Sequence, residues 1–275
     1  MLSIIIPAYR EPFLQKTIDS LRKNSISDIE IIAVENNLGM RNAVNQGIAR
    51  AKGDFIMKCD AHCLFAPGYD KALTENCAEN WLVIPRRYSV EEETWTRDEK
   101  RGIRDYHYLT FPHESDYGYG MQGKEWNERS EERKDPKYDV DDQMSFQGSC
   151  WVANTKYFKE HIGTLDDRIE TYGGFAQEPQ EIGLKYWLGG GENKIVKKTW
   201  YAHLSKRKKH YDAAMFSRRY KKDPRTLASH TWSSIHWLND REPNMKYKFE
   251  WLLEKFAPVP TWPVDWREIW EGYHL

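Results

Sequence analysis

The stretch MKCDAHCLFAPGYD, residues 57–70, places Asp60 and His62 two positions apart, with Cys59 and Cys63 on either side. In a β-strand, residues i and i+2 point to the same side, so the carboxylate and the imidazole would face one ligand together. A carboxylate oxygen with an imidazole nitrogen suits a borderline divalent cation such as Mn2+ and leaves coordination positions open for substrate oxygens. We therefore interpret the pair as a candidate metal site, and the alternative is a solvated strand end.

The cysteines indicate neither a structural zinc site nor a redox motif. Cys59 and Cys63 are four positions apart without a second pair, and the chain has no C-x-x-C sequence. Cys77 and Cys150 add no disulfide-framework spacing in a chain of 275 residues. We expect four reduced thiols that pack as small apolar side chains, as is usual in a cytosolic protein.

Residues 2–60 alternate between strand and helix patterns. LSIIIPAY, IEIIAVENN and FIMKCD are apolar runs that end in polar residues, which is typical of buried parallel strands. Between them, EPFLQKTIDSLRKNS and MRNAVNQGIARAKGD have a helical apolar period. This order predicts a doubly wound α/β fold, in which ligands bind at the carboxyl ends of the strands. Those ends are residues 7–10, 35–37 and 60–62, so three polar groups would converge on one crevice.

The rest of the chain is less regular. The sequence predicts a strand at 80–87, a strand and then a helix over 144–163, a glycine-stopped helix at 179–191 and a strand at 193–205. Residues 89–142 are charged and lack periodicity, so we expect an excursion or flexible lobe outside the core. The residues after 205 mix basic, aromatic and proline-containing stretches, for which we expect short helices.

Charge is unevenly distributed although the formal net charge is −1. Residues 91–142 carry 16 acidic and 9 basic side chains, whereas residues 196–225 carry 11 basic and 2 acidic ones. Either two differently solvated surfaces or an anionic ligand near the basic segment explains this asymmetry. No run reaches the ~20 apolar residues that span a bilayer, and MLSIIIPAYREPF becomes polar too early for a signal peptide. We expect a soluble, cytoplasmic protein without a membrane segment.

The ordered motifs IIIPAY, EIIAVENN and GDFIMKCDAHC resemble the nucleotide-sugar-binding half of the GT-A glycosyltransferases, especially those of family 2. DAHC followed by PGY, and the later YGGFAQEPQEIGLKYWLGGG, resemble the polypeptide N-acetylgalactosaminyltransferases. The resemblance covers residues 1–85 and 145–205. It implies an α/β fold of the GT-A type, with a Rossmann-like, doubly wound mixed sheet. It also implies a hexosyltransferase that uses a UDP-sugar donor and a divalent cation.

The resemblance further implies a site. In this family the D-x-H pair binds Mn2+, which holds the donor diphosphate, and a later histidine completes the ligand set. The matching residues are Asp60, His62 and, in WYAHLSK, His203, for which a core or surface histidine is the alternative. Residues expected to contact the donor are Pro7, Ala8, Tyr9, Glu11, Glu35, Arg41, Asp60, Gly173 and Gly174. Glu35 stands where the family usually has an Asp that contacts uracil, and Arg41 is either a donor contact or an exposed helix residue.

One departure from the family concerns the catalytic base. Inverting family-2 enzymes usually carry a Glu-Asp pair at the amino end of the helix before the glycines, where a carboxylate takes the acceptor proton. Here the pair reads Glu178-Pro179, and proline is compatible with a first helical turn. We favour Glu178 as the acceptor-side carboxylate, with Glu181 as the second candidate, while a retaining reaction would need no such base. The structural alternative is that Glu178 only caps the helix dipole.

The acceptor prediction depends on the basic segment after His203. SKRKKHYDAAMFSRRYKKDPR interleaves basic residues with Tyr and Phe, which suits a phosphate backbone and an unstacked base. Residues expected to contact the acceptor or a phosphate are Lys206, Arg207, Lys208, Arg218 and Arg219. A small enzyme of this kind resembles the bacteriophage transferases that glycosylate hydroxymethylated pyrimidines in DNA, so DNA is the first candidate acceptor. The alternatives are a glycan or small molecule, a solvated basic face, and a non-catalytic nucleic-acid-binding module.

These patterns divide the chain into a catalytic domain, residues 1–205, and a basic, Trp-rich C-terminal extension, residues 206–275. Within the catalytic domain we expect a nucleotide-sugar-binding half at 1–88, a charged insertion or lid at 89–142, and an acceptor half at 143–205. The sequence does not specify the sugar, the stereochemical outcome or the oligomeric state.

Overall fold

The computed structural model describes residues 1–113, 119–173, 176–205 and 224–273. Its centre is a nine-stranded mixed sheet with the order β2-β1-β3-β10-β5-β11-β4, in which β6 also pairs with β5 and β9 with β11. The strands of this sheet are β1 (Leu2–Pro7), β2 (Ile29–Val34), β3 (Phe55–Cys59), β4 (Cys63–Phe65), β5 (Trp81–Glu91), β6 (Thr96–Asp98), β9 (Val140–Asp142), β10 (Cys150–Asn154) and β11 (Glu192–His203). A separate two-stranded sheet consists of β7 (His107–Leu109) and β8 (Gly123–Glu125).

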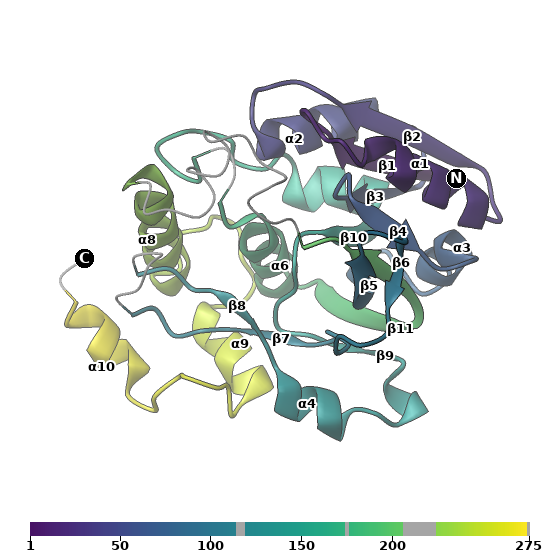
Figure 1. Ribbon diagram of the computed structural model, residues 1–275. Helices are drawn as coiled ribbons and strands as arrows, with labels where there is room; N and C mark the ends of the chain where they lie inside the picture. Colours follow the sequence, from purple (N-terminus) through teal and green to yellow (C-terminus); the bar gives the residue numbers. More distant parts are fainter. Residues whose placement is uncertain (114–118, 174–175, 206–223, 274–275) are drawn as a thin grey trace.

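Helices cover both faces of the large sheet (Figure 1). They are α1 (Leu14–Asn24), α2 (Met40–Arg50), α3 (Tyr69–Thr74), α4 (Asn127–Glu132), α5 (Thr155–Tyr157), α6 (Glu178–Gly189), α8 (Pro224–Leu238), α9 (Phe249–Phe256) and α10 (Trp266–Glu271), with the 3-10 helix η1 (Pro136–Tyr138) and the π-helix η2 (Phe158–Ile162). Residues of α1 and α3 pack on one face of the sheet, and residues of α2 and α6 pack on the other.

Strand β1 is buried on both faces, which explains its continuous apolar sequence. Ile4 and Ile6 pack into one cluster with α1 and α3, whereas Ile5 packs into the other with α2 and α6. The two-residue period of the strand therefore divides its side chains between two cores. Helix α2 lies so close to β1 that a Cβ at Gly47 would be 2.3 Å from Ile5 Cγ2, so this contact requires glycine.

The strand directions bring five carboxyl ends to one edge of the sheet. β1 pairs in parallel with β2 and β3, as predicted for residues 2–60. β10 is antiparallel to both β3 and β5, so β5 and its parallel neighbour β11 point the same way as β3. The prediction of a doubly wound, mixed α/β sheet is confirmed. As a consequence, the end of β11 lies at the same edge as the ends of β1 and β3.

Element boundaries follow local sequence signals with small differences. α6 ends at Gly189, and the residue that caps it, Gly190, has a φ of 94°, so the predicted glycine stop is confirmed. α2 ends at Arg50, before the predicted end at Gly53, and β5 continues beyond residue 87 to Glu91. All four cysteines are free and buried, as expected for packed thiols.

The expectation that residues 89–142 lie outside the core is wrong. β7, β8 and their neighbours contribute buried side chains to a large cluster that also contains residues of α6, α8, α9 and α10. The contributing residues from this segment are Tyr106, Tyr108, Leu109, Phe111, Met121 and Trp126. These apolar residues are spaced irregularly among charges, so no strand or helix period reveals them. The domain limits stay a prediction.

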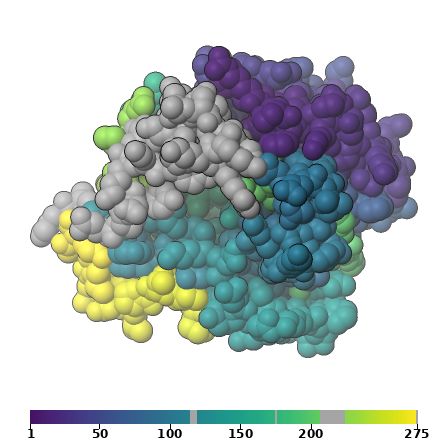
Figure 2. Space-filling model, viewed as in Figure 1, coloured from purple at the N-terminus to yellow at the C-terminus, as the bar shows by residue number. Residues whose placement is uncertain are grey.

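The C-terminal tryptophans belong to the same cluster. Trp237 of α8, Phe249 and Phe256 of α9 and Trp266 of α10 are buried in it, together with residues of α6. In the space-filling view, N-terminal residues occupy one end of the molecule and C-terminal residues the opposite end, with residues around 90–140 between them (Figure 2). Within the described ranges, no helix is long and apolar enough to cross a membrane.

Candidate functional site

The Asp60–His62 motif forms a turn at the end of β3, and not the strand that the sequence suggested. β3 ends at Cys59, and the chain then reverses into the short strand β4. Backbone hydrogen bonds fix this turn: Asp60 N donates to Ser149 O at 3.0 Å, and Leu204 N donates to His62 O at 3.0 Å. The neighbouring strands therefore hold the motif, and its two polar side chains converge although the strand argument for their convergence does not apply.

The structure brings the three predicted metal ligands together. One ligand atom from each of Asp60, His62 and His203 lies within 4.8 Å of the other two, and we call these three residues the ligand cluster. Asp60 Oδ2 is 3.1 Å from His203 Nε2 and 3.8 Å from His62 Nε2. The two imidazole rings are 4.7 Å apart between centroids. The turn after β3 and the end of β11 therefore form one polar site at the shared edge of the sheet.

The chemistry of the ligand cluster fits a divalent cation. His62 is buried, and neither of its ring nitrogens makes a hydrogen bond within the described part of the chain. An imidazole buried in this way loses its hydration without gaining a hydrogen bond, and coordination to a cation would compensate for that loss. Glu11, predicted to contact the donor, lies beside the cluster, with Oε2 3.4 Å from His62 Nδ1.

Charge and burial set the protonation states of two cluster residues. Burial by itself would raise the pKa of Asp60, but the ammonium of Lys58 and the hydrogen bond from His203 hold it well below its usual value. Burial lowers the pKa of His203 to about 3, so its ring is neutral at neutral pH. An ionised carboxylate and a neutral imidazole are the forms that bind metals.

Lys58 links the ligand cluster to α6. Its Nζ lies 2.8 Å from Asp60 Oδ1 and 3.3 Å from Glu178 Oε2, and it also donates to Gly148 O. The other oxygen of Glu178 accepts from Trp151 Nε1 at 2.9 Å. Both oxygens of the favoured acceptor-side carboxylate are therefore engaged by buried partners. These are contacts that fix its position, and a role as the base stays a prediction.

Glu181 and Arg41 form a different, buried network. Glu181 is ion-paired with Arg41 and with Lys185, and its Oε1 accepts from Asp166 N at 3.2 Å. Arg41 also donates to Ala176 O, and its guanidinium lies 4.0 Å over the ring of Tyr172. Arg41 is fully buried, so the interpretation as an exposed helix residue is wrong. Its guanidinium connects α2 to α6 through Glu181, and a contact with the donor stays a prediction.

The other predicted donor residues lie at the expected strand ends. Ala8 is buried, and its N donates to Val34 O at 2.9 Å, which joins the ends of β1 and β2. Pro7, Tyr9 and the exposed Glu35 lie on either side of this junction. Gly173 has a φ of 61°, a conformation that favours glycine. Gly174, Lys206, Arg207, Lys208, Arg218 and Arg219 lie outside the described residues.

Two cations that adjoin the ligand cluster were missed from the sequence. Lys58 interrupts the apolar strand FIMKC directly before the motif, and a lysine in a buried strand is itself a signal of a carboxylate partner. Arg87 is buried in β5, and its Nη2 lies 3.1 Å from His203 Nδ1. Its contact crosses from β5 to β11, so no local pattern indicates it.

The known proteins that this chain resembles in sequence and structure are glycosyltransferases. Residues 33–162 match the model of Glycosyl transferase family 2. In structure, the chain is similar to GalNAc-T7, solved with UDP, GalNAc and Mn2+, with a TM-score of 0.69 and 16% identity over 96% of this chain and 58% of that one. The chain therefore has the GT-A fold, and its residues 33–162 are similar to glycosyl transferase family 2.

Several curated relatives are polypeptide N-acetylgalactosaminyltransferases. Polypeptide N-acetylgalactosaminyltransferase 6 of Bos taurus is 24% identical over 74% of this chain and 32% of its own length. Polypeptide N-acetylgalactosaminyltransferase 3 of Mus musculus is 26% identical over 66% of this chain and 28% of its own length. The uncharacterized glycosyltransferase EpsJ of Bacillus subtilis is 32% identical over 30% of this chain and 32% of its own length. The resemblance to the polypeptide N-acetylgalactosaminyltransferases that the motifs indicated is confirmed. The chain matches about a third of the length of these relatives.

Proposed function

We propose that this chain is a metal-dependent glycosyltransferase that moves a sugar from a UDP-sugar to a hydroxyl acceptor. The observation that carries the proposal is the convergence of Asp60, His62 and His203 at the carboxyl edge of a GT-A sheet. In doubly wound folds, this edge is where ligands bind. The solved neighbour that contains UDP, GalNAc and Mn2+ supports the choice of nucleotide and cation.

The ligand cluster would hold Mn2+ through Asp60 Oδ2 and a nitrogen of each histidine. When bound, the cation supplies Lewis-acid neutralisation of the diphosphate leaving group. Lys58 keeps Asp60 ionised and oriented, and Arg87 orients the ring of His203. The ends of β1 and β2, with Pro7, Tyr9 and Glu35, would line the nucleoside pocket, and Gly173 and Gly174 would approach the sugar.

We propose that Glu178 is the base that takes the proton of the acceptor hydroxyl. It lies in the first turn of α6, and Lys58 joins it to Asp60. For this role, one oxygen must leave Lys58 or Trp151 when the acceptor binds. The alternative is a retaining reaction, which needs no carboxylate base at this position. NMR of the anomeric proton in the product separates the two, because inversion would support Glu178 as the base and retention would exclude it.

The test of the proposed activity is release of UDP from a panel of UDP-sugars, with Mn2+ or with EDTA. We expect release from at least one donor with Mn2+ and none with EDTA. Release that is unaffected by EDTA would contradict a metal-dependent transferase. If no UDP-sugar or UDP binds and the protein shows a salt-dependent affinity for DNA, the rival function of a non-catalytic nucleic-acid-binding module would be favoured.

A hydroxymethylated pyrimidine in DNA, as in a bacteriophage DNA-modifying enzyme, is the first acceptor candidate from sequence. Its support is the basic and aromatic sequence around residues 206–219, and the target base would have to leave the duplex to reach the site. Digestion of treated DNA and mass spectrometry of its nucleosides test this candidate. A sugar mass on the modified base is the expected result, and UDP release without such an adduct would exclude it. A cytoplasmic location stays a prediction.

A further inference from the structure

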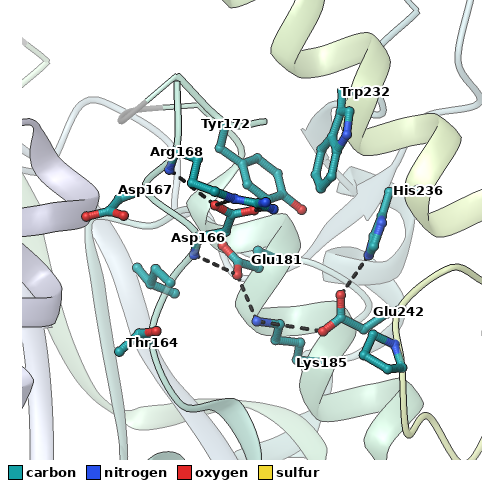
Figure 3. Close-up of a pocket in the computed structure, with 12 residues that line it drawn as sticks. Thr164, Asp166, Asp167, Arg168, Tyr172, Glu181, Lys185, Trp232, His236 and Glu242 are labelled. Carbon is teal, nitrogen blue, oxygen red and sulfur yellow. Dashed lines mark hydrogen bonds and ion pairs between the residues drawn. The ribbon is translucent and has the colours of Figure 1, made fainter. Parts of the chain in front are cut away.

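A cavity of about 470 Å3 lies between the loop at residues 164–168, the first turns of α6, and α8. None of the three ligand-cluster residues lines it. Figure 3 shows Trp232 and His236 on one side of the cavity, across from Asp166 and Arg168. Its volume is in the range of roughly 300–1,000 Å3 that is usual for small-molecule sites.

One wall of the cavity is aromatic. Trp232 and His236 lie one turn apart on α8, with their rings stacked at 4.8 Å and 16°. Tyr172 meets Trp232 edge to face, at 4.9 Å between centroids. Tyr172 is buried and Trp232 is half-buried, so the arrangement presents a fixed aromatic surface to the cavity. Such a surface suits a ligand with one flat, weakly polar face.

Charged groups beside the aromatic wall and across from it can form directed hydrogen bonds. Lys185 Nζ is 2.8 Å from Glu181 Oε1 and 3.8 Å from Glu242 Oε1, and His236 Nε2 is 2.7 Å from Glu242 Oε2. Across the cavity, Arg168 is ion-paired with Asp166 at 2.7 Å. Each pair fixes a donor beside an acceptor, which matches the adjacent hydroxyls of a sugar ring.

Charge excludes several other ligand classes. The lining contains four carboxylates, Asp166, Asp167, Glu181 and Glu242, and two permanent cations, Arg168 and Lys185. Burial by itself would raise the pKa of Asp166, but its hydrogen bonds with Arg168 lower it to about 2, so this carboxylate is ionised at neutral pH. Because Arg41 also pairs with Glu181 behind the lining, a single negative charge remains in excess, which disfavours phosphate groups. So many charged groups disfavour a purely apolar ligand.

We propose that this cavity binds one pyranose unit of a neutral saccharide, on the acceptor side of the proposed transferase. The inference rests on the proposed function for its place in the reaction. The cavity-lining Glu181 and the cluster-linked Glu178 are three residues apart at the start of α6, so one helical turn connects the two sites. The aromatic wall would contact the face of the ring, and the ion pairs would bind its hydroxyls.

The test measures binding of methyl glycosides of glucose, galactose, N-acetylglucosamine and N-acetylgalactosamine by calorimetry and saturation-transfer NMR, without metal or nucleotide. At least one glycoside should bind the wild type. Trp232→Ala should weaken its Kd about tenfold, whereas Trp232→Phe, which keeps a ring, should stay within about threefold. Asp167→Asn removes the charge of a lining carboxylate that accepts a hydrogen bond from Asn42, and it should weaken the Kd severalfold. Trp251→Ala removes a half-buried tryptophan of α9 that does not line the cavity, and it is the matched control.

Any of three results would overturn the proposal. No glycoside binds, the Kd is unchanged in both Trp232→Ala and Asp167→Asn, or binding is lost in Asp60→Asn. The last result would place the sugar at the ligand cluster. Because no metal or nucleotide is added, these outcomes are independent of UDP release. If no glycoside binds but Mn2+-dependent UDP release is intact, only the saccharide site is contradicted. If a glycoside binds but UDP is not released with Mn2+, the proposed activity is contradicted.

Discussion

At the scale of single residues, Lys58 has the most consequential contacts. Its ammonium lies between Asp60 and Glu178, and only 2% of its side chain is exposed. Burial alone would lower its pKa, but the two carboxylates raise it, so Lys58 stays charged. Removal of a cation from such a position leaves uncompensated buried charge, which costs far more than the loss of a surface ion pair.

Lys58→Met should therefore lower the free energy of unfolding by about 3–5 kcal/mol, measured by urea denaturation. Lys71→Met, at a lysine with 56% exposure, is the control and should change it by less than about 0.5 kcal/mol. Adding Glu178→Gln to Lys58→Met should cost less than the sum of the single changes, with a coupling of about 1–3 kcal/mol. Additive effects would contradict the assigned contact.

Residue types at the strand ends could be predicted from sequence, whereas their partners could not. Asp60, His62 and His203 were predicted because a family pattern marks them, and the shared direction of β3 and β11 brings them together. Arg41 was misjudged because its partners, Asp166, Ala176 and Glu181, are more than a hundred residues away in sequence. Burial of a charged group depends on such distant contacts, which helix periodicity does not contain.

At the scale of elements, the packing of α2 on β1 fixes the N-terminal strands of the sheet. The close approach depends on Gly47, whose missing Cβ leaves room for Ile5. Elements with a regular apolar period, such as α1, α2 and β1–β3, were predicted from local sequence. The short strands β4, β7 and β8 were not, because three residues are too few to show a period, and tertiary pairing defines them.

Gly47→Ala should lower the free energy of unfolding by about 1–3 kcal/mol, because the added methyl would overlap Ile5 and force α2 away from β1. Gly189→Ala is the matched control, since its nearest neighbour, Met245 Cε, would be 3.9 Å from the new Cβ. That change should be neutral or stabilising by up to about 1 kcal/mol, as helix propensity predicts. Equal effects of the two substitutions in chemical denaturation would contradict the close packing.

At the scale of the whole molecule, the C-terminal helices and the 106–126 region share one core with α6. The cluster joins β7 and β8 to α8, α9 and α10, so neither segment buries its apolar side chains alone. α6 belongs to this cluster and to the cluster under β1, and it therefore connects the two parts of the molecule. We expect them to unfold together.

Leu252→Ala in α9 should lower the free energy of unfolding by about 2–5 kcal/mol, as is typical of a buried leucine. The loss should appear in one transition that coincides by tryptophan fluorescence and far-UV circular dichroism. Leu38→Ala, at a leucine with 66% exposure, is the control and should have little effect. Two separate transitions, with only one affected by Leu252→Ala, would show that the C-terminal region unfolds independently.

The most direct measurement of the central claim is calorimetric titration of UDP in the presence and absence of Mn2+. Wild-type protein should bind UDP tightly only with Mn2+, and Asp60→Asn should weaken this binding more than about 100-fold without loss of folded structure. Asp54→Asn, at an exposed carboxylate before β3, should bind as the wild type does. Equal Mn2+-dependent affinity in Asp60→Asn and wild type, or UDP binding that does not need the cation, would contradict the metal-dependent site.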